Sequence, residues 1–169
     1  MNLKETVLRW LFRAGANTNA FMTRRPLLQP IEAACTRLYV RLAFVVRGRR
    51  SVAPTAEALG EEWARFMPTG GGVRITDRDD QTVYGEILNH CPLRGTGDVD
   101  ACHRMMAYDR GLLAPMRGHL VVLRSQAEPG VTTCRVAIRP FDVGIADLVP
   151  AHVRAARSAG HASRADGER

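Results

Sequence analysis

The stretch "GVRITDRDDQTVYGEIL", residues 72–88, decides the fold class of this chain of 169 residues. Apolar and polar residues alternate on both sides of an acidic turn, which is the pattern of two antiparallel strands joined in a β-hairpin. The residues before this stretch follow a different period, because their apolar side chains recur three and four positions apart, as on one face of a helix. We therefore expect helices before this stretch and a sheet from it onward.

Two helices are predicted at the N-terminal end. Residues 2–14 have apolar side chains at helical spacing, and "GANTN" at 15–19 is expected to break this helix. A second helix is expected to begin near Pro26 or Pro30, since proline suits the first helical turn. It should end in the basic segment 47–50, where positive charge suits the helix dipole.

A third helix is predicted over residues 53–68. Thr55 is a suitable N-cap, and acidic residues follow it in the early turns. The spacing of Leu59, Trp63 and Phe66 places these three side chains on one face, which we expect to point inward.

The chain after the hairpin predicts one more helix and two more strands. Residues 95–116 are typical of a loop followed by a helix, with Asp98 or Asp100 as its N-cap. Strands are expected over 118–128 and 131–140. The fold class is therefore α+β, with N-terminal helices followed by an antiparallel sheet in a hairpin–helix–hairpin order.

The same patterns divide the chain into three regions. Residues 1–70 form a basic helical region, and residues 71–145 form the mixed helix and strand module. Residues 146–169 are expected to hold a weak helix and a small, polar, disordered tail.

The positive charge of the chain is concentrated in its first region. The net charge of the whole chain is +7, and residues 1–50 carry ten basic and two acidic residues. Residues 51–140 carry ten basic and eleven acidic residues and are nearly neutral. A basic segment of this kind suits contact with nucleic acid, an acidic protein or an anionic membrane surface, although an Arg-rich helix face is also compatible with simple solvation.

Hydropathy and cysteine content set the expected compartment. No apolar run reaches the roughly 18 residues of a transmembrane helix, and the N-terminus lacks the pattern of a secretory signal. We therefore expect a cytoplasmic protein. In a reducing compartment its four cysteines are more readily ligands, nucleophiles or core residues than disulfides.

Three cysteines mark the candidate functional site. Cys91 follows the first hairpin, Cys102 lies in the first turn of the predicted helix, and Cys134 lies in the last strand. Their spacings differ from the close CxxC pairs of zinc fingers, so the fold would have to bring the sulfurs together. A position in a first helical turn favours the thiolate form of Cys102. Thiolate is the form that binds a metal or attacks a substrate.

The order "CPL", "CH", "DRGLL" and a late strand cysteine resembles a three-cysteine module found in several families. It is similar to the C-terminal sensor domain of SufR-type regulators, to the 4-vinyl reductase domain and to the L-2-amino-thiazoline-4-carboxylate hydrolase-like family. The resemblance covers about residues 73–140. It implies a 4-vinyl-reductase-like fold for the hairpin–helix–hairpin module, with Gly130 in the turn before the last strand.

The resemblance implies that Cys91, Cys102 and Cys134 hold an iron–sulfur cluster, most simply [4Fe–4S], in a sensor or accessory protein. Zinc is the alternative metal, since thiolates select both, and His103 is a candidate fourth ligand. The resemblance to the hydrolase-like family implies instead an enzyme acting on a small cyclic C–N substrate. In that case Cys102 or Cys91 would be nucleophile or ligand, and His103 or Asp109 would be the base. A third interpretation is that all three cysteines only fill the core.

Expected partners follow from the basic helices. We predict a homodimer or a protein partner that contacts the helices of residues 1–70. Contact with nucleic acid stays open, although these residues show no clear helix–turn–helix pattern. A small-molecule effector is compatible with a sensor module.

Overall fold

The computed structural model of the chain describes residues 14–67 and 72–167, with side chains described as far as residue 160. It confirms an α+β fold with a four-stranded antiparallel sheet. From residue 29 onward, the α-helices of the described residues are α2 (Gln29–Arg47), α3 (Ala56–Phe66), α4 (Val99–Met105), α5 (Ala107–Leu113) and α6 (Ala151–Gly167). Two short 3-10 helices are η1 (Pro26–Leu28) and η2 (Ala114–Met116). The strands are β1 (Val73–Arg78), β2 (Val83–Ile87), β3 (Gly118–Arg124) and β4 (Cys134–Pro140).

The sheet combines the two predicted hairpins in the order β1-β2-β4-β3. The strands that meet in its centre are β2 and β4, and their pairing ends with Ile87 opposite Cys134. Cys91 comes four residues after Ile87 in the sequence, so the sheet register already brings the first and last cysteine segments to the same end of the sheet. The expected hairpin–helix–hairpin order is therefore present, and it positions the candidate site.

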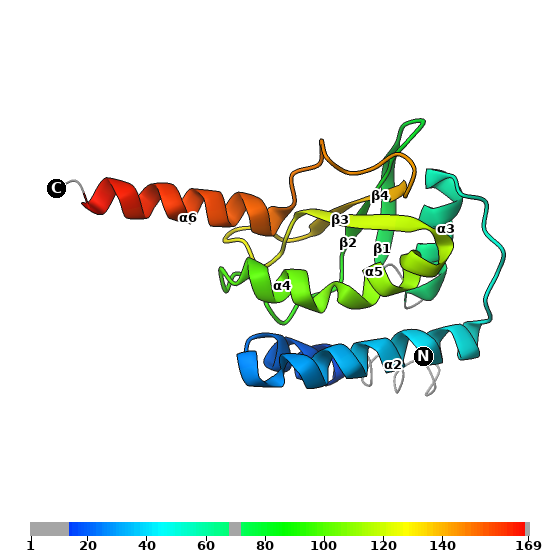
Figure 1. The fold of residues 1–169 in the computed structure, drawn as a ribbon, viewed down its shortest axis with the longest axis horizontal. Coiled ribbons are helices and arrows are strands. Elements are labelled where there is room, and N and C mark those ends of the chain that lie inside the picture. The colour runs from blue at the N-terminus through cyan, green and yellow to red at the C-terminus, as the bar shows by residue number, and fades with distance from the viewer. Residues whose placement is uncertain (1–13, 68–71, 168–169) are drawn as a thin grey trace.

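The elements form layers (Figure 1). Helices α3 and α5 pack against the strands, and α2 packs on α5, so α4 and α5 lie between α2 and the sheet in this view. Helix α6 extends away from the body of the molecule (Figure 1). No helix among the described residues combines the length and the apolar character that crossing a bilayer requires.

Helix α3 forms as its sequence predicts. The Thr55 hydroxyl accepts a hydrogen bond from the N–H of Ala58, which satisfies a donor that the first turn leaves free. Leu59, Trp63 and Phe66 are all buried in one core cluster that also contains residues of the sheet. The apolar spacing of this helix therefore identified its inward face correctly.

Arg65 fastens the end of α2 to α3. Its guanidinium donates to the carbonyl oxygens of Arg47 and Gly48, where α2 ends, and also to the carboxylate of Glu62. Carbonyl groups at a helix C-terminus lack partners within the helix. The arginine supplies such partners and holds the two helices together.

Residues 14–23 differ from the prediction for the N-terminal end. They form a helix that runs through "GANTN", although we expected a break there. Ala20 and Thr23 are buried in this helix, and the Thr23 carbonyl accepts a hydrogen bond from Arg104. Tertiary packing therefore outweighs the low helix propensity of these residues. The rest of the helix predicted over 2–14 lies outside the described residues.

The structure also differs from the prediction at two later points. The single helix expected after Asp98 is divided at Met106 into α4 and α5, and Asp98 caps the first of them through the N–H of Ala101. At the C-terminal end, α6 runs to Gly167, where we expected a disordered tail. Alanine has the highest helix propensity, and this segment contains several. The boundaries of the three predicted regions stay a prediction.

A glycine permits the close approach of α2 to α5. A Cβ atom on Gly111 of α5 would lie 2.9 Å from Cγ2 of Val40 in α2. We predict that Gly111→Ala lowers the free energy of unfolding by about 1 kcal/mol or more, because overpacking costs roughly 1–3 kcal/mol and exceeds the gain in helix propensity.

Denaturant unfolding of single and double variants measures this effect. The cost of Gly111→Ala should shrink when Val40→Ala is combined with it, because the clashing methyl is then absent. Gly160→Ala in α6, where nothing lies within 4 Å, is the control and should not destabilise. A full cost of Gly111→Ala that persists in the Val40→Ala background would contradict the close contact.

Candidate functional site

The three cysteines predicted as ligands lie together in the structure. The side chains of Cys102 and Cys134 share a hydrogen bond, and Cys91 is close enough to act electrostatically on both. All three are buried, with exposed fractions of 8% for Cys91, 1% for Cys102 and 4% for Cys134. Cys102 of a helix and Cys134 of a strand therefore interact directly in the interior, and Cys91 of a loop lies near them.

Each of these sulfur atoms also has a polar donor beside it. The N–H of Leu93 donates to Cys91 Sγ over 3.4 Å, and the N–H of Gln126 donates to Cys134 Sγ over 3.2 Å. The Ser125 side chain hydrogen-bonds Cys102. Hydrogen bonds to cysteine sulfur are a feature of iron–sulfur sites, where they help to set the potential.

The hydrogen bond between Cys102 and Cys134 shifts the pKa values of the two thiols in opposite directions. Acceptance of the Cys134 hydrogen bond lowers the pKa of Cys102, and the Ser125 hydroxyl adds to this effect against the cost of burial. The same bond and burial raise the pKa of Cys134. Burial also raises the pKa of Cys91. Cys102 is therefore the thiol that ionises first.

Gln126 organises the backbone around the sulfurs, and sequence analysis did not identify it. Its side-chain oxygen accepts hydrogen bonds from the N–H of Cys91 and from Arg94, and its side-chain nitrogen donates to the carbonyl oxygens of Ile87 and Asn89. Its side chain is fully buried. Because its backbone N–H reaches Cys134, one residue joins two of the three cysteine segments.

His103 does not join the sulfurs. Its ring stacks on that of His152 in α6, with ring centroids 3.8 Å apart. Burial and the neighbouring Arg110 guanidinium lower the pKa of His103 to about 4, and no cysteine contributes to this shift. The structure therefore places this candidate fourth ligand in the contact between α4 and α6.

The described residues contain no group of three or more His, Cys, Asp or Glu side chains arranged around a single metal ion. A mononuclear zinc site needs its sulfurs about 2.3 Å from one common point. The three thiols meet in one region without surrounding such a point.

Asp109 is a buried carboxyl group beside the cysteine cluster. Trp63 Nε1 donates to its Oδ1 over 2.8 Å, and its charge acts on Cys102. Burial raises the pKa of Asp109 to about 6, against the opposing effect of the Trp63 hydrogen bond. The carboxyl group joins α5 to α3 and lies near the Cys102 thiol.

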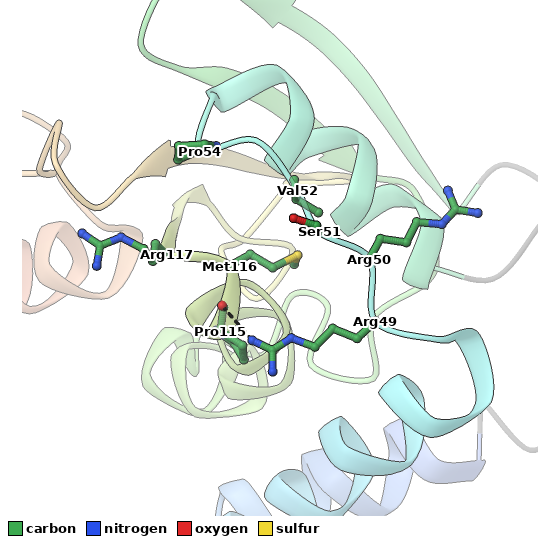
Figure 2. A pocket seen from close by; sticks show the side chains of 8 residues that line it. All are labelled: Arg49, Arg50, Ser51, Val52, Pro54, Pro115, Met116 and Arg117. Atoms are coloured by element: carbon green, nitrogen blue, oxygen red, sulfur yellow. Dashed lines mark hydrogen bonds between the residues drawn. The ribbon is translucent and has the colours of Figure 1, made fainter.

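Two surface hollows of the protein lie apart from the cysteines. The larger, of about 490 Å³, is lined by residues 49–52, 54 and 115–117 (Figure 2). The other, of about 320 Å³, is lined by residues 55–57 and 78–80. Neither hollow includes a cysteine, and Cys102 is almost fully buried, so neither offers a substrate access to that thiol.

Comparison with protein-family models, with curated proteins and with solved structures gives no match for this chain. The resemblance to three-cysteine families stays a prediction from the residues, and the geometry of the site has to carry the functional argument.

We predict that Gln126→Ala lowers the free energy of unfolding by about 3 kcal/mol, since it leaves buried partners such as the Cys91 N–H unsatisfied. Denaturant unfolding monitored by circular dichroism measures the change. Replacement of the exposed Gln81 by alanine is the matched control and should change stability little. Equal stability of the two variants would show that the Gln126 hydrogen bonds contribute nothing.

The raised pKa of Asp109 predicts a pH dependence. The folded carboxyl group holds its proton up to about pH 6, and the unfolded one only up to about pH 3.8. Its contribution to stability is therefore complete below pH 3.8 and is lost as the pH rises to 6, by about 3 kcal/mol at most. Asp109→Asn keeps an acceptor for Trp63 but cannot titrate.

Thermal unfolding from about pH 4 to about pH 7 compares the two proteins. The stability of Asp109→Asn relative to the wild type should increase as the pH rises to about 6 and then stay constant. Parallel pH profiles would mean that Asp109 titrates alike in the folded and unfolded chain.

Proposed function

We propose that Cys91, Cys102 and Cys134 bind an iron–sulfur cluster and that the protein is a metal-dependent sensor or accessory protein. The observation that supports the proposal is the direct contact of Cys102 with Cys134, with Cys91 near them, all three buried and each with its own hydrogen-bond donor. A 4-vinyl-reductase-like module, as in SufR-type sensor domains, fits the hairpin–helix–hairpin order.

The hydrogen bonds argue against cysteines that only fill space. A core cysteine acts as a small apolar side chain and needs only apolar neighbours. Here Cys102 and Cys134 contact each other through their sulfurs, and backbone N–H groups of Leu93 and Gln126 are directed at sulfur atoms. These donors act to lower the pKa of the thiols they contact, against the effect of burial, and so favour the thiolate that a metal binds.

An iron–sulfur cluster suits this arrangement better than zinc. A zinc ion requires sulfurs around one point, and the described residues have no such group. A cluster distributes its cysteine ligands over several iron atoms. Three thiolates leave one iron of a [4Fe–4S] cluster for another ligand, and this supplies redox and effector-binding chemistry when the cluster is bound.

The residues of this chain have distinct parts in such a site. The three cysteines would hold the cluster, with Cys102 as the thiol whose pKa is lowered. The hydrogen bonds from Leu93, Ser125 and Gln126 to the cysteine sulfurs would tune the electron density of these ligands. The surrounding core would exclude water, since Leu93, Val99 and Ala127 are buried in one cluster with Cys91 and Cys102.

A hydrolase on a small cyclic C–N substrate has less support. Asp109 has a pKa suited to proton transfer, yet neither of the two hollows reaches Cys102. His103, the other candidate base, stacks on His152.

Anaerobic purification followed by measurement of iron, sulfide and zinc tests the proposal. Wild-type protein should be brown and contain about four iron and four sulfide per chain if the cluster is [4Fe–4S]. Cys134→Ala should lose most of both, because one of three protein ligands is gone. Cys35→Ala, which removes the cysteine of α2, is the matched control and should keep the full content.

The other results are equally decisive. One zinc per chain without iron or sulfide would favour the zinc alternative. Anaerobic wild-type protein without any of the three elements would exclude a metal site at these cysteines.

A further inference from the structure

Helix α2 is apolar on two sides, although it is an outer layer of the molecule. Its inner side places Val40, Ala43 and Phe44 against the core. Its outer side exposes a set of large apolar side chains to solvent, which we call the outer face of α2: Ile31 (54%), Leu38 (56%), Leu42 (48%), Val45 (78%) and Val46 (81%). A surface helix normally presents polar residues to water, and a helix that is apolar all round is normally buried.

The outer face is continuous with other exposed apolar residues. Leu27 of η1 is 92% exposed and Tyr39 of α2 is 60% exposed. Isolated apolar residues on a surface need no explanation, but a contiguous group of this size marks a contact site. Figure 1 shows α2 along one side of the molecule, with α4 and α5 on its inner side.

The charges around this face are positive. Residues 14–50 contain seven arginines and a single acidic residue, Glu32. Glu32 is buried and accepts a hydrogen bond from Thr36, so it adds no exposed negative charge. Arg37 and Arg41 are exposed beside the apolar residues and make no ion pair with an acid of the described residues.

The larger hollow extends this positive surface past the end of α2. Arg49, Arg50 and Arg117 line it, together with Pro115 and other residues of the 49–54 segment. Figure 2 shows the Arg49 side chain directed at the Pro115 carbonyl, while Arg50 and Arg117 point in other directions. The three arginines therefore add diffuse positive charge and do not converge on one small anion.

We propose that the outer face of α2 and its arginines bind the surface of an anionic lipid bilayer. The aliphatic side chains would enter the boundary between headgroups and acyl chains, and the arginines would contact lipid phosphates. This chemistry accounts for both the apolar and the positive character of the surface. The inference does not depend on the proposed cluster.

Other occupants fit the observations less well. Nucleic acid phosphates would pair with the arginines, but they offer nothing to the row of exposed leucines and valines. A second copy of the chain would cover the apolar residues, but it would bring two arginine-rich surfaces of equal charge together. An anionic bilayer satisfies both parts of the surface at once.

Binding of the full chain to lipid vesicles tests the inference. Vesicles of phosphatidylcholine with phosphatidylglycerol and vesicles of phosphatidylcholine alone are sedimented with the protein at low and high salt. The anionic vesicles should carry the protein down at low salt, and binding should fall as salt is added. The neutral vesicles should bind much less.

Two double variants, each with a control double variant, separate the apolar and the charged contributions to binding. Leu38→Ser with Leu42→Ser should weaken binding about tenfold or more. In the bound protein the bilayer would bury both leucines, and their burial contributes more than about 1.4 kcal/mol. Ile75→Ser with Val149→Ser, at similarly exposed apolar sites elsewhere, should bind like the wild type. Arg37→Gln with Arg41→Gln should weaken binding about thirtyfold, at about 1 kcal/mol per arginine. Arg124→Gln with Arg135→Gln is its control.

Circular dichroism and light scattering complete the experiment. The variants should keep the wild-type circular dichroism spectrum, since the replaced side chains are exposed. Absent binding of the wild type, or equal binding to neutral vesicles, would overturn the inference. A wild-type dimer that does not bind vesicles, and that Leu38→Ser with Leu42→Ser makes monomeric, would overturn it in favour of self-association.

Discussion

The arrangement around the sulfurs depends on one buried amide. Gln126 uses both ends of its side chain and its backbone N–H, so it ties the end of β2, the Cys91 segment and the start of β4 at one point. A buried polar group is expensive unless all its hydrogen bonds are made. This requirement makes the corner specific, because a small shift of any of the three segments would leave donors or acceptors without partners.

The cysteine site and the outer face of α2 are held in place by different parts of the fold. The sheet register and the Gln126 corner hold the cysteines in the interior. Helix α2 is held from its inner side, by close contact with α5 at Gly111 and by Arg65 at its C-terminal end. Its outer side is therefore available without any cost to the core. The polar donors at the buried thiols and the contiguous exposed aliphatic residues of α2 each coincide with one of the proposed binding functions.

Local patterns of the sequence predicted much of the fold. The alternation at 72–88 predicted the first hairpin, and the spacing of Leu59, Trp63 and Phe66 predicted the buried face of α3. These predictions succeed because periodicity and capping are properties of neighbouring residues.

Contacts between residues that are distant in the sequence could not be predicted from local patterns. Gln126 carries no periodic signal, because the partners of its side chain lie more than thirty positions away. The helix through residues 14–23 depends on burial of Ala20 and Thr23 against a helix that follows much later. The position of His103 is set in the same way by His152 of α6. Such features require the assembled structure, since nothing local distinguishes them.

The short helices α4 and α5, which meet at Met106, connect the cysteine site with α2. One of them carries Cys102 and the other carries Gly111, which touches α2, so this pair of helices runs from the sulfurs to the outer layer. Arg104 makes a second link, to the carbonyl of Thr23. Close-packed interiors pass on displacements that they cannot absorb. A displacement of Cys102 would therefore be expected to reach α2 through α5.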